Sequence, residues 1–429
     1  MKMKRLFVLG LLVVMAVSAF GFQPVGVHAA SPVQIDFWGG WTGPDGDVMR
    51  GLVEKFNKEH PGITVNLMTL QWTPLFSKFI IEAKGGNPPD VLAMHPFELG
   101  QFASMGVLDA KQVKSVKVKK ADYTPNIWQG SFYSKVQYAV PLDFHTHALY
   151  YNKELLDKAG VASAPQNLEE FIKAGQKLTI DKNGKNAGEA GFDPNNVIQY
   201  GLGMNMNHHA FYQWFALMYQ QNEKTFNEKT TRTSFNNNKA AKAWGFLQDL
   251  VFKYNIVPKG EKAPFDDFRA GKVAMLIDGP WQLPVLEKSN LKFGVAPYPQ
   301  IFQKKAVWAA AHILTFPVNK KADASRKAAA VQFVKWLSDN SAEWAKSGNI
   351  PSKMSTIAET KKLPGREAFI NMMSYAHFLP PLPKAAQVFS SVAPSPILTA
   401  AQDTLFNNKK PLDIVAQMKK EMDSILSAP

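Results

Sequence analysis

The alternation of strand-like and helix-like patterns near the N-terminus constrains the fold most. Residues 33–38 (VQIDFW) predict a strand, and residues 48–56 carry apolar side chains at three-to-four spacing, which predicts a helix that stops before Pro61. A second strand is predicted at 63–70. A strand, a helix and a strand in this order form a parallel pair joined by a right-handed crossover. The chain is therefore predicted to be an α/β protein.

The same alternation continues toward the C-terminus. Further strands are predicted at 91–94, 138–142, 273–277 and 293–299. Helices are predicted at 76–83, 167–178, 208–219, 239–252, 325–337 and 412–426. With 429 residues, the chain is too long for one hydrophobic core and long enough for two lobes of ordinary size.

The stretch VAMLIDGPWQLP at residues 273–284 joins a strand to a sharp turn. Five apolar residues at 273–277 predict a buried strand, which Gly279 and Pro280 end. An indole that follows such a turn is well placed to form a flat wall of a cleft. The alternative is that Trp281 packs between two layers of the fold.

The first 30 residues predict a signal peptide rather than a structural element. Lys2, Lys4 and Arg5 precede an apolar run at 6–20, and small residues suited to cleavage lie near Ala30. The chain contains no cysteine, so a lipid-anchoring lipobox, a disulfide framework and a thiolate metal site are excluded. A periplasmic or secreted protein is expected, and no later stretch is long and apolar enough to span a bilayer.

The composition is that of a folded protein with an excess of positive charge. The formal net charge is +14, and loss of the three basic residues of the signal peptide lowers it to about +11. The basic residues are scattered and lack the aromatic interleaving of nucleic-acid grooves, so no nucleic-acid partner is expected. Ten tryptophans exceed what a core of this size usually needs, which points mildly to a ligand that stacks on rings.

Five motifs in a fixed order resemble one protein family over nearly the whole mature chain. They are KFNKEHPGITV at 55–65, PPDV at 88–91, ALYYNKELLDKAG at 148–160, MLIDGPW at 275–281 and NIPSKMS at 349–355. Their order resembles that of the extracellular solute-binding proteins of ABC sugar importers, family 1, the maltose-binding-protein-like group.

The resemblance implies a two-lobed periplasmic binding protein fold of type II that closes on its ligand by a hinge. The implied lobes are discontinuous: residues 31–142 with 297–355 form the N-terminal lobe, and 143–296 with 356–429 form the C-terminal lobe. The chain would cross between them near Leu142 and Ala296 and again after Ser355. Closure requires contacts that only the closed state makes, so aromatic faces from both lobes are expected at the ligand.

The family positions also imply which residues bind the ligand. Trp41, Trp72 and His95 would come from loops at the carboxyl ends of the first strands, which line the crevice of an open α/β sheet. The other implied positions are Asp143, His145, His209, Phe211, Asp278, Trp281, Trp308 and Phe389. The stretch WAAAH at 308–312 stands where relatives have a glycine-rich ligand loop.

The predicted function is capture of a carbohydrate, a di- or oligosaccharide rather than a monosaccharide, and its delivery to the permease subunits of an ABC transporter. Sugar C–H faces lie on aromatic rings, and desolvated hydroxyls need carboxylate, amide or imidazole partners. The protein is expected to be a monomer and not an enzyme, with no cofactor and no metal.

Three alternatives remain. The first is a ligand such as glycerol phosphate or an acidic sugar, in keeping with the basic charge. The second is a metal-binding protein that uses His145 with His147 or the His208–His209 pair. The third is an exported glycosidase, which would need two carboxylates flanking the scissile bond.

Overall fold

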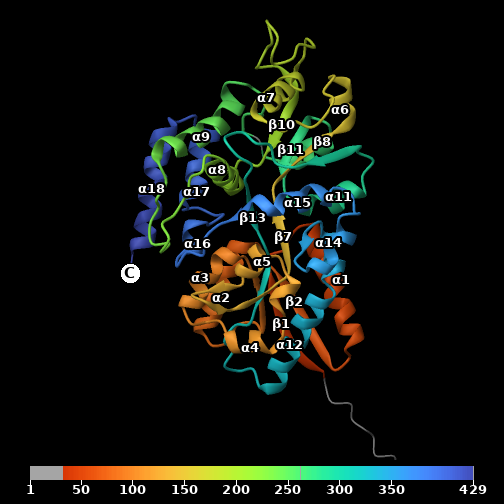
Figure 1. Ribbon diagram of the computed structural model, residues 1–429, viewed down its shortest axis with the longest axis vertical. Coiled ribbons are helices and arrows are strands. Elements are labelled where there is room, and N and C mark those ends of the chain that lie inside the picture. Colours follow the sequence, from red (N-terminus) through yellow and green to blue (C-terminus); the bar gives the residue numbers. More distant parts are fainter. Residues whose placement is uncertain (1–31, 261, 429) are drawn as a thin grey trace, which may run out of the picture. The chain divides into compact units, whose positions relative to one another are not determined.

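The computed structural model describes residues 32–260 and 262–428, and the predicted signal peptide lies outside them. Within them, the chain from Val33 onward forms one compact unit with three main sheets (Figure 1). Among these described residues, no helix has the length and apolarity that crossing a bilayer requires.

The first sheet has the strand order β2-β1-β3-β14-β6. β1 (Val33–Gly39) pairs in parallel with β2 (Ile63–Thr69) and β3 (Val91–Met94), which confirms the predicted parallel pair. β14 (Ile313–Thr315) is antiparallel to β3 and to β6 (Ala139–Pro141). A strand from far along the chain therefore completes the sheet that the N-terminus begins.

Helices on this sheet bury apolar stripes against it. They include α1 (Pro44–Glu59), α2 (Trp72–Lys84), α3 (Pro96–Ser104), α4 (Ala110–Ser115), α5 (Pro125–Gln129) and α12 (Ala324–Asp339). The α1 stripe consists of Met49, Leu52, Val53 and Phe56, all buried. These residues recur three and four apart, which places them on one face of the helix.

The second sheet has the strand order β12-β8-β11-β10-β9. Its strands are β8 (Ala148–Asn152), β9 (Ile180–Asp181), β10 (Val197–Met204), β11 (Val273–Asp278) and β12 (Phe293–Ala296). All six residues of β11 are buried, as the apolar run at 273–277 predicts. β11 is parallel to β10 and antiparallel to β8.

Helices also accompany the second sheet. Shorter ones are α6 (Lys153–Lys158), α7 (Leu168–Lys177), α10 (Pro264–Arg269) and α11 (Leu283–Glu287). Four other helices pack side by side in Figure 1: α8 (His208–Gln220), α9 (Asn237–Phe252), α17 (Pro396–Leu405) and α18 (Pro411–Ser427). α8 is buried on nearly all sides, because α9, α17 and β13 each contact it.

A third sheet, β15-β7-β13-β16, lies where the chain passes between the other two. β7 (Asp143–Thr146) leads from the first sheet to the second, and β13 (Val307–Ala310) leads back. The return lies downstream of Ala296, near which the resemblance implied a crossing, because β12 still pairs with β8 in the second sheet. β15 (Ile350–Pro351) and β16 (Ala376–Phe378) complete the third sheet.

The remaining elements are short. They are the hairpin β4 (Phe132–Tyr133) and β5 (Val136–Gln137), and the helices α13 (Ser341–Trp344), α14 (Met354–Thr360), α15 (Arg366–Met372) and α16 (Ala385–Val388).

Candidate ligand-binding site

A cavity of about 430 Å³ opens among the loops that follow the strands. Its lining combines aromatic rings with imidazoles and a few small polar groups. The rings are Trp72, Phe76, Phe97, Tyr212, Trp281, Trp308 and Phe389, and the imidazoles are His95, His145, His208, His209 and His312. The lining comes from loops that follow strands of the first two sheets, from β7 and β13 of the third sheet, and from α1, α2, α3, α8 and α16.

The turn after β11 fixes the position of Trp281. Asp278 accepts hydrogen bonds from the Gly279 N–H (2.7 Å) and from Nε2 of Gln282 (2.9 Å), and the hydroxyl of Tyr150 donates to the Gly279 carbonyl (2.6 Å). A Cβ at Gly279 would lie 2.1 Å from Cη2 of Trp281, so the indole rests directly on the backbone. The indole is therefore held in place as a wall of the cavity.

Trp72 is the first residue of α2 and lies against two of the imidazoles that line the cavity. Its ring stacks on His312 with the centroids 5.3 Å apart and an interplanar angle of 17°, and it contacts His95 at 4.4 Å. Trp41 meets it edge-on at 5.8 Å. Trp41, Trp72 and His95 thus lie together, as expected for loops at the carboxyl ends of neighbouring strands.

Gly40 provides the space that the Trp72 ring occupies. A Cβ at this position would lie 1.9 Å from Cδ2 of Trp72, which is a steric clash. We expect Gly40→Ala to push the indole out of place at a cost of about 1–3 kcal/mol and to weaken ligand binding. Isothermal titration calorimetry measures the affinity. Gly51→Ala in α1 is the control, because a Cβ there meets nothing within 4 Å; equal affinities for the two variants would contradict the expectation.

Asp143 lies behind the cavity, and its carboxylate binds several of the neighbouring side chains. The side chain is fully buried, and its carboxylate accepts hydrogen bonds from the backbone N–H of His312 (2.7 Å), Nδ1 of His312 (2.6 Å) and Nε1 of Trp344 (2.6 Å). Nδ1 of His145 lies 3.4 Å away. Burial alone would raise the pKa of Asp143, but the charge and hydrogen bonds of His312 and His145 outweigh it and hold this pKa well below its usual range.

The other imidazoles are largely desolvated. Burial lowers the pKa of His145 to about 4, of His147 to about 3 and of His208 to about 4, and holds the pKa of His209 well below its usual range. Nε2 of His147 and Nδ1 of His209 share a hydrogen bond of 3.0 Å. These rings are neutral at pH 7, so each carries one N–H donor and one acceptor nitrogen. His147 and His209 use one nitrogen each in their shared bond, which leaves the other nitrogen of His209 for a ligand in the cavity.

Burial raises the pKa of Asp278 from 3.8 to about 6. The folded protein therefore binds this proton more tightly than the unfolded chain, and ionisation lowers the free energy of unfolding as the pH rises from about 4 to about 6. An amide at this position cannot ionise, and its oxygen can still accept the Gly279 N–H. We expect the free energy of unfolding of Asp278→Asn, relative to that of the wild type, to rise by up to about 3 kcal/mol between pH 4 and pH 7. Urea unfolding across this range measures it, and a difference that does not vary with pH would contradict it.

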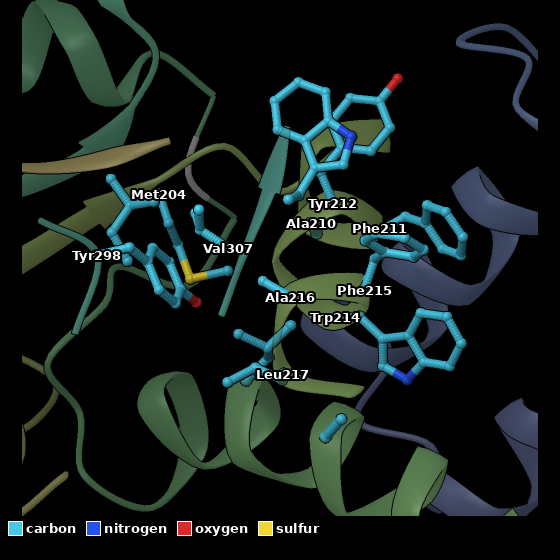
Figure 2. Packing of buried hydrophobic residues seen from close by; sticks show 14 of the residues in the cluster. Met204, Ala210, Phe211, Tyr212, Trp214, Phe215, Ala216, Leu217, Tyr298 and Val307 are labelled. Carbon is cyan, nitrogen blue, oxygen red and sulfur yellow. The ribbon is translucent and has the colours of Figure 1, made fainter. Parts of the chain in front are cut away.

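Seven of the residues implied by the resemblance line the cavity: Trp72, His95, His145, His209, Trp281, Trp308 and Phe389. The other four are not among the lining residues. Trp41 and Asp143 lie behind it, Asp278 forms the turn under Trp281, and Phe211 is fully buried. Figure 2 shows Phe211 and Trp214 pointing from α8 toward the helices drawn in blue.

The cavity lining also includes four residues that the sequence did not predict to bind the ligand: His208, Tyr212, Phe97 and His312. Tyr212 stacks on Trp308 with an interplanar angle of 1° and a centroid distance of 4.2 Å. It lies one helical turn after His208 and His209 on α8, a spacing that places the three side chains on neighbouring positions. This spacing is the sequence signal that could have identified Tyr212 as a residue of the site.

Comparison with known proteins identifies the family. Residues 40–344 match the bacterial extracellular solute-binding protein family. The chain belongs to this family. Its members are extracellular binding proteins rather than enzymes, so the glycosidase alternative is set aside.

The sequence identity to individual relatives is low. The chain is 24% identical to the maltotriose-binding protein of Pyrococcus abyssi over 390 residues, 88% of this chain and 79% of the relative. Among solved structures, the substrate-binding protein Lmo0181 of Listeria monocytogenes in complex with cycloalternan superposes with a TM-score of 0.78 at 20% identity, over 93% of this chain and all of that one. The maltotriose-bound MalE domain of Bdellovibrio bacteriovorus gives 0.76 at 22% identity, over 91% and 99%. These likenesses confirm the two-lobed α/β fold.

Proposed function

We propose that this solute-binding protein captures a neutral di- or oligosaccharide in the cavity and delivers it to the permease subunits of an ABC transporter. The observation that carries the proposal is the lining, in which the indoles of Trp72, Trp281 and Trp308 lie together with five imidazoles. Rings of this kind cover the C–H faces of sugars, and imidazoles pair with hydroxyls. The names of the relatives, which bind maltotriose and cycloalternan, agree with it.

The proposed mechanism is hinge closure of two lobes, residues 31–142 with 297–355 and residues 143–296 with 356–429. Contacts between the two parts support it. Oγ of Ser391 lies 2.8 Å from Oγ1 of Thr73, and the side chain of Gln101 accepts the Ala386 N–H at 2.8 Å. Such contacts form only when the lobes are together, so they favour a ligand-retaining closed state. The protein would act as a monomer, exported by the signal peptide at residues 1–30 and released without a lipid anchor.

A phosphorylated ligand is the second candidate, because the chain is 25% identical to the sn-glycerol-3-phosphate-binding protein UgpB of Pectobacterium atrosepticum over 80% of its length. The lining disfavours it. Among the described residues, no lysine or arginine lines the cavity, whereas Asp45 and Glu98 do. A phosphate requires cationic or N–H-rich partners, which this lining does not supply.

Calorimetric titration of the purified protein tests the proposal. We expect 1:1 binding of maltotriose or a related oligosaccharide, with the sugar recovered intact afterwards, and no heat with sn-glycerol 3-phosphate. Binding of glycerol phosphate alone would favour the second candidate. Absence of a binding heat with di- and oligosaccharides of every common linkage would overturn the proposal.

A further inference from the structure

Three buried histidines from separate elements meet at one wall of the cavity. His95 caps the N-terminus of α3, His145 lies on β7, and His312 lies between β13 and β14. One ring nitrogen of each lies within 4.8 Å of a ring nitrogen of both others. Their exposed fractions are 9%, 3% and 4%. Residues so distant in sequence meet here only because the fold brings the three elements together.

A carboxylate holds the Nδ1 atom of each ring. Glu98 lies 3.0 Å from Nδ1 of His95 and also accepts its backbone N–H, and Asp143 lies 2.6 Å and 3.4 Å from Nδ1 of His312 and His145. A carboxylate can only accept, so Nδ1 carries the proton and Nε2 keeps its lone pair. Among residues 32–260 and 262–428, no hydrogen bond to Nε2 of these three rings is formed.

We propose that His95, His145 and His312 bind a divalent transition-metal ion, of which Zn²⁺ is the representative, through Nε2. Carboxylates that orient metal-binding imidazoles through Nδ1 are the usual outer shell of such sites. The carboxylates of Glu98 and Asp143 supply negative charge that offsets the ion. Imidazole ligands select Zn²⁺, Cu²⁺ and Ni²⁺ over Mg²⁺ and Ca²⁺.

The arrangement suits an ion better than a sugar hydroxyl. Each of the three rings brings one nitrogen within 4.8 Å of the other two, whereas a sugar hydroxyl donates a single proton and needs only one acceptor. Zinc–nitrogen bonds of about 2.0–2.1 Å in a tetrahedral centre set the nitrogens about 3.4 Å apart. The rings must therefore draw together from separations of up to 4.8 Å. The fourth position of the ion would face the cavity, as in zinc sites that keep one position open.

The site shares one wall of the cavity with the proposed sugar binding, but its three ligands are imidazoles and none of them is a sugar-stacking indole. The test uses the full secreted chain, purified without a histidine tag and stripped of metal with a chelator. Titration with ZnCl₂ is expected to give one site per chain, and MgCl₂ to give none. Co²⁺ is expected to produce the visible absorption bands of a tetrahedral complex, which nitrogen-poor surface binding does not produce.

Two variants locate the site. His145→Gln and His312→Gln are each expected to weaken Zn²⁺ binding at least about 100-fold and to abolish the Co²⁺ bands. The control is His377→Gln, whose ring stacks on Tyr219 away from the cluster and which is expected to bind as the wild type does. If a variant fails to fold, the presence or absence of tetrahedral Co²⁺ bands in the wild type decides whether the metal site exists. Absence of 1:1 binding, wild-type spectra without tetrahedral bands, or affinity unchanged in folded variants would each overturn the proposal.

Discussion

Replacement of Trp281 by alanine is expected to weaken oligosaccharide binding by about 30- to 1,000-fold, equivalent to about 2–4 kcal/mol. The indole is pinned to the backbone at Gly279 and contacts His145 and His209 edge-on, with centroid distances of 5.9 Å and 5.6 Å. Its removal takes away a preorganised stacking face and admits water to the imidazoles. Both effects reduce the affinity without requiring a change of fold.

Calorimetry with the oligosaccharide that the wild type binds measures this effect. Trp336→Ala is the matched control, because Trp336 is half-buried on α12 and donates to Glu59 far from the cavity lining. That variant is expected to lose stability but to keep its affinity. Wild-type affinity in Trp281→Ala would show that the indole only fills space and would move the stacking role to Trp72 or Trp308.

Replacement of Asp143 by alanine is expected to lower the free energy of unfolding by about 3–5 kcal/mol. The change leaves two N–H groups of His312 and the indole N–H of Trp344 buried without an acceptor. Each orphaned donor carries a desolvation penalty of about 1–3 kcal/mol, so the loss exceeds that of an average substitution.

Urea unfolding monitored by circular dichroism provides the measurement. Asp339→Ala is the control, because that carboxylate pairs with Lys335 and Lys353 at the surface, and such pairs contribute about 1 kcal/mol or less. Asp143→Asn keeps one acceptor and is expected to fall between the wild type and the alanine variant. A loss below about 1 kcal/mol in Asp143→Ala would mean that water replaces the carboxylate.

Local patterns predicted most of the elements, because apolar periodicity reports which face is buried. The missed boundaries have physical causes. α2 begins at Trp72 rather than near Phe76 and includes Pro74 in its first turn. Proline is tolerated there because its missing N–H has no intrahelical partner to lose. α1 likewise begins at Pro44.

The site was harder to predict than the fold. The rule that loops follow strand ends anticipated that Trp72 and His95 would lie together. It could not separate Phe211, which faces the neighbouring helices, from Tyr212, which lines the cavity, because both lie on the same aromatic-rich helix. Nor could it place His312 beside His145, since their proximity depends on strand pairing between β7 and β13, more than 160 residues apart.

The position of β14 affects how the chain matures. β6 joins the first sheet only through β14, so that sheet stays incomplete until residue 315 has been synthesised. Pairing across such long sequence separations is slow, because the chain must close a large loop before any contact compensates the lost entropy. A nascent chain of this kind therefore stays incompletely folded for longer. Under the proposed export, late closure of the first sheet would keep the chain unfolded for longer, which is the state that translocation requires.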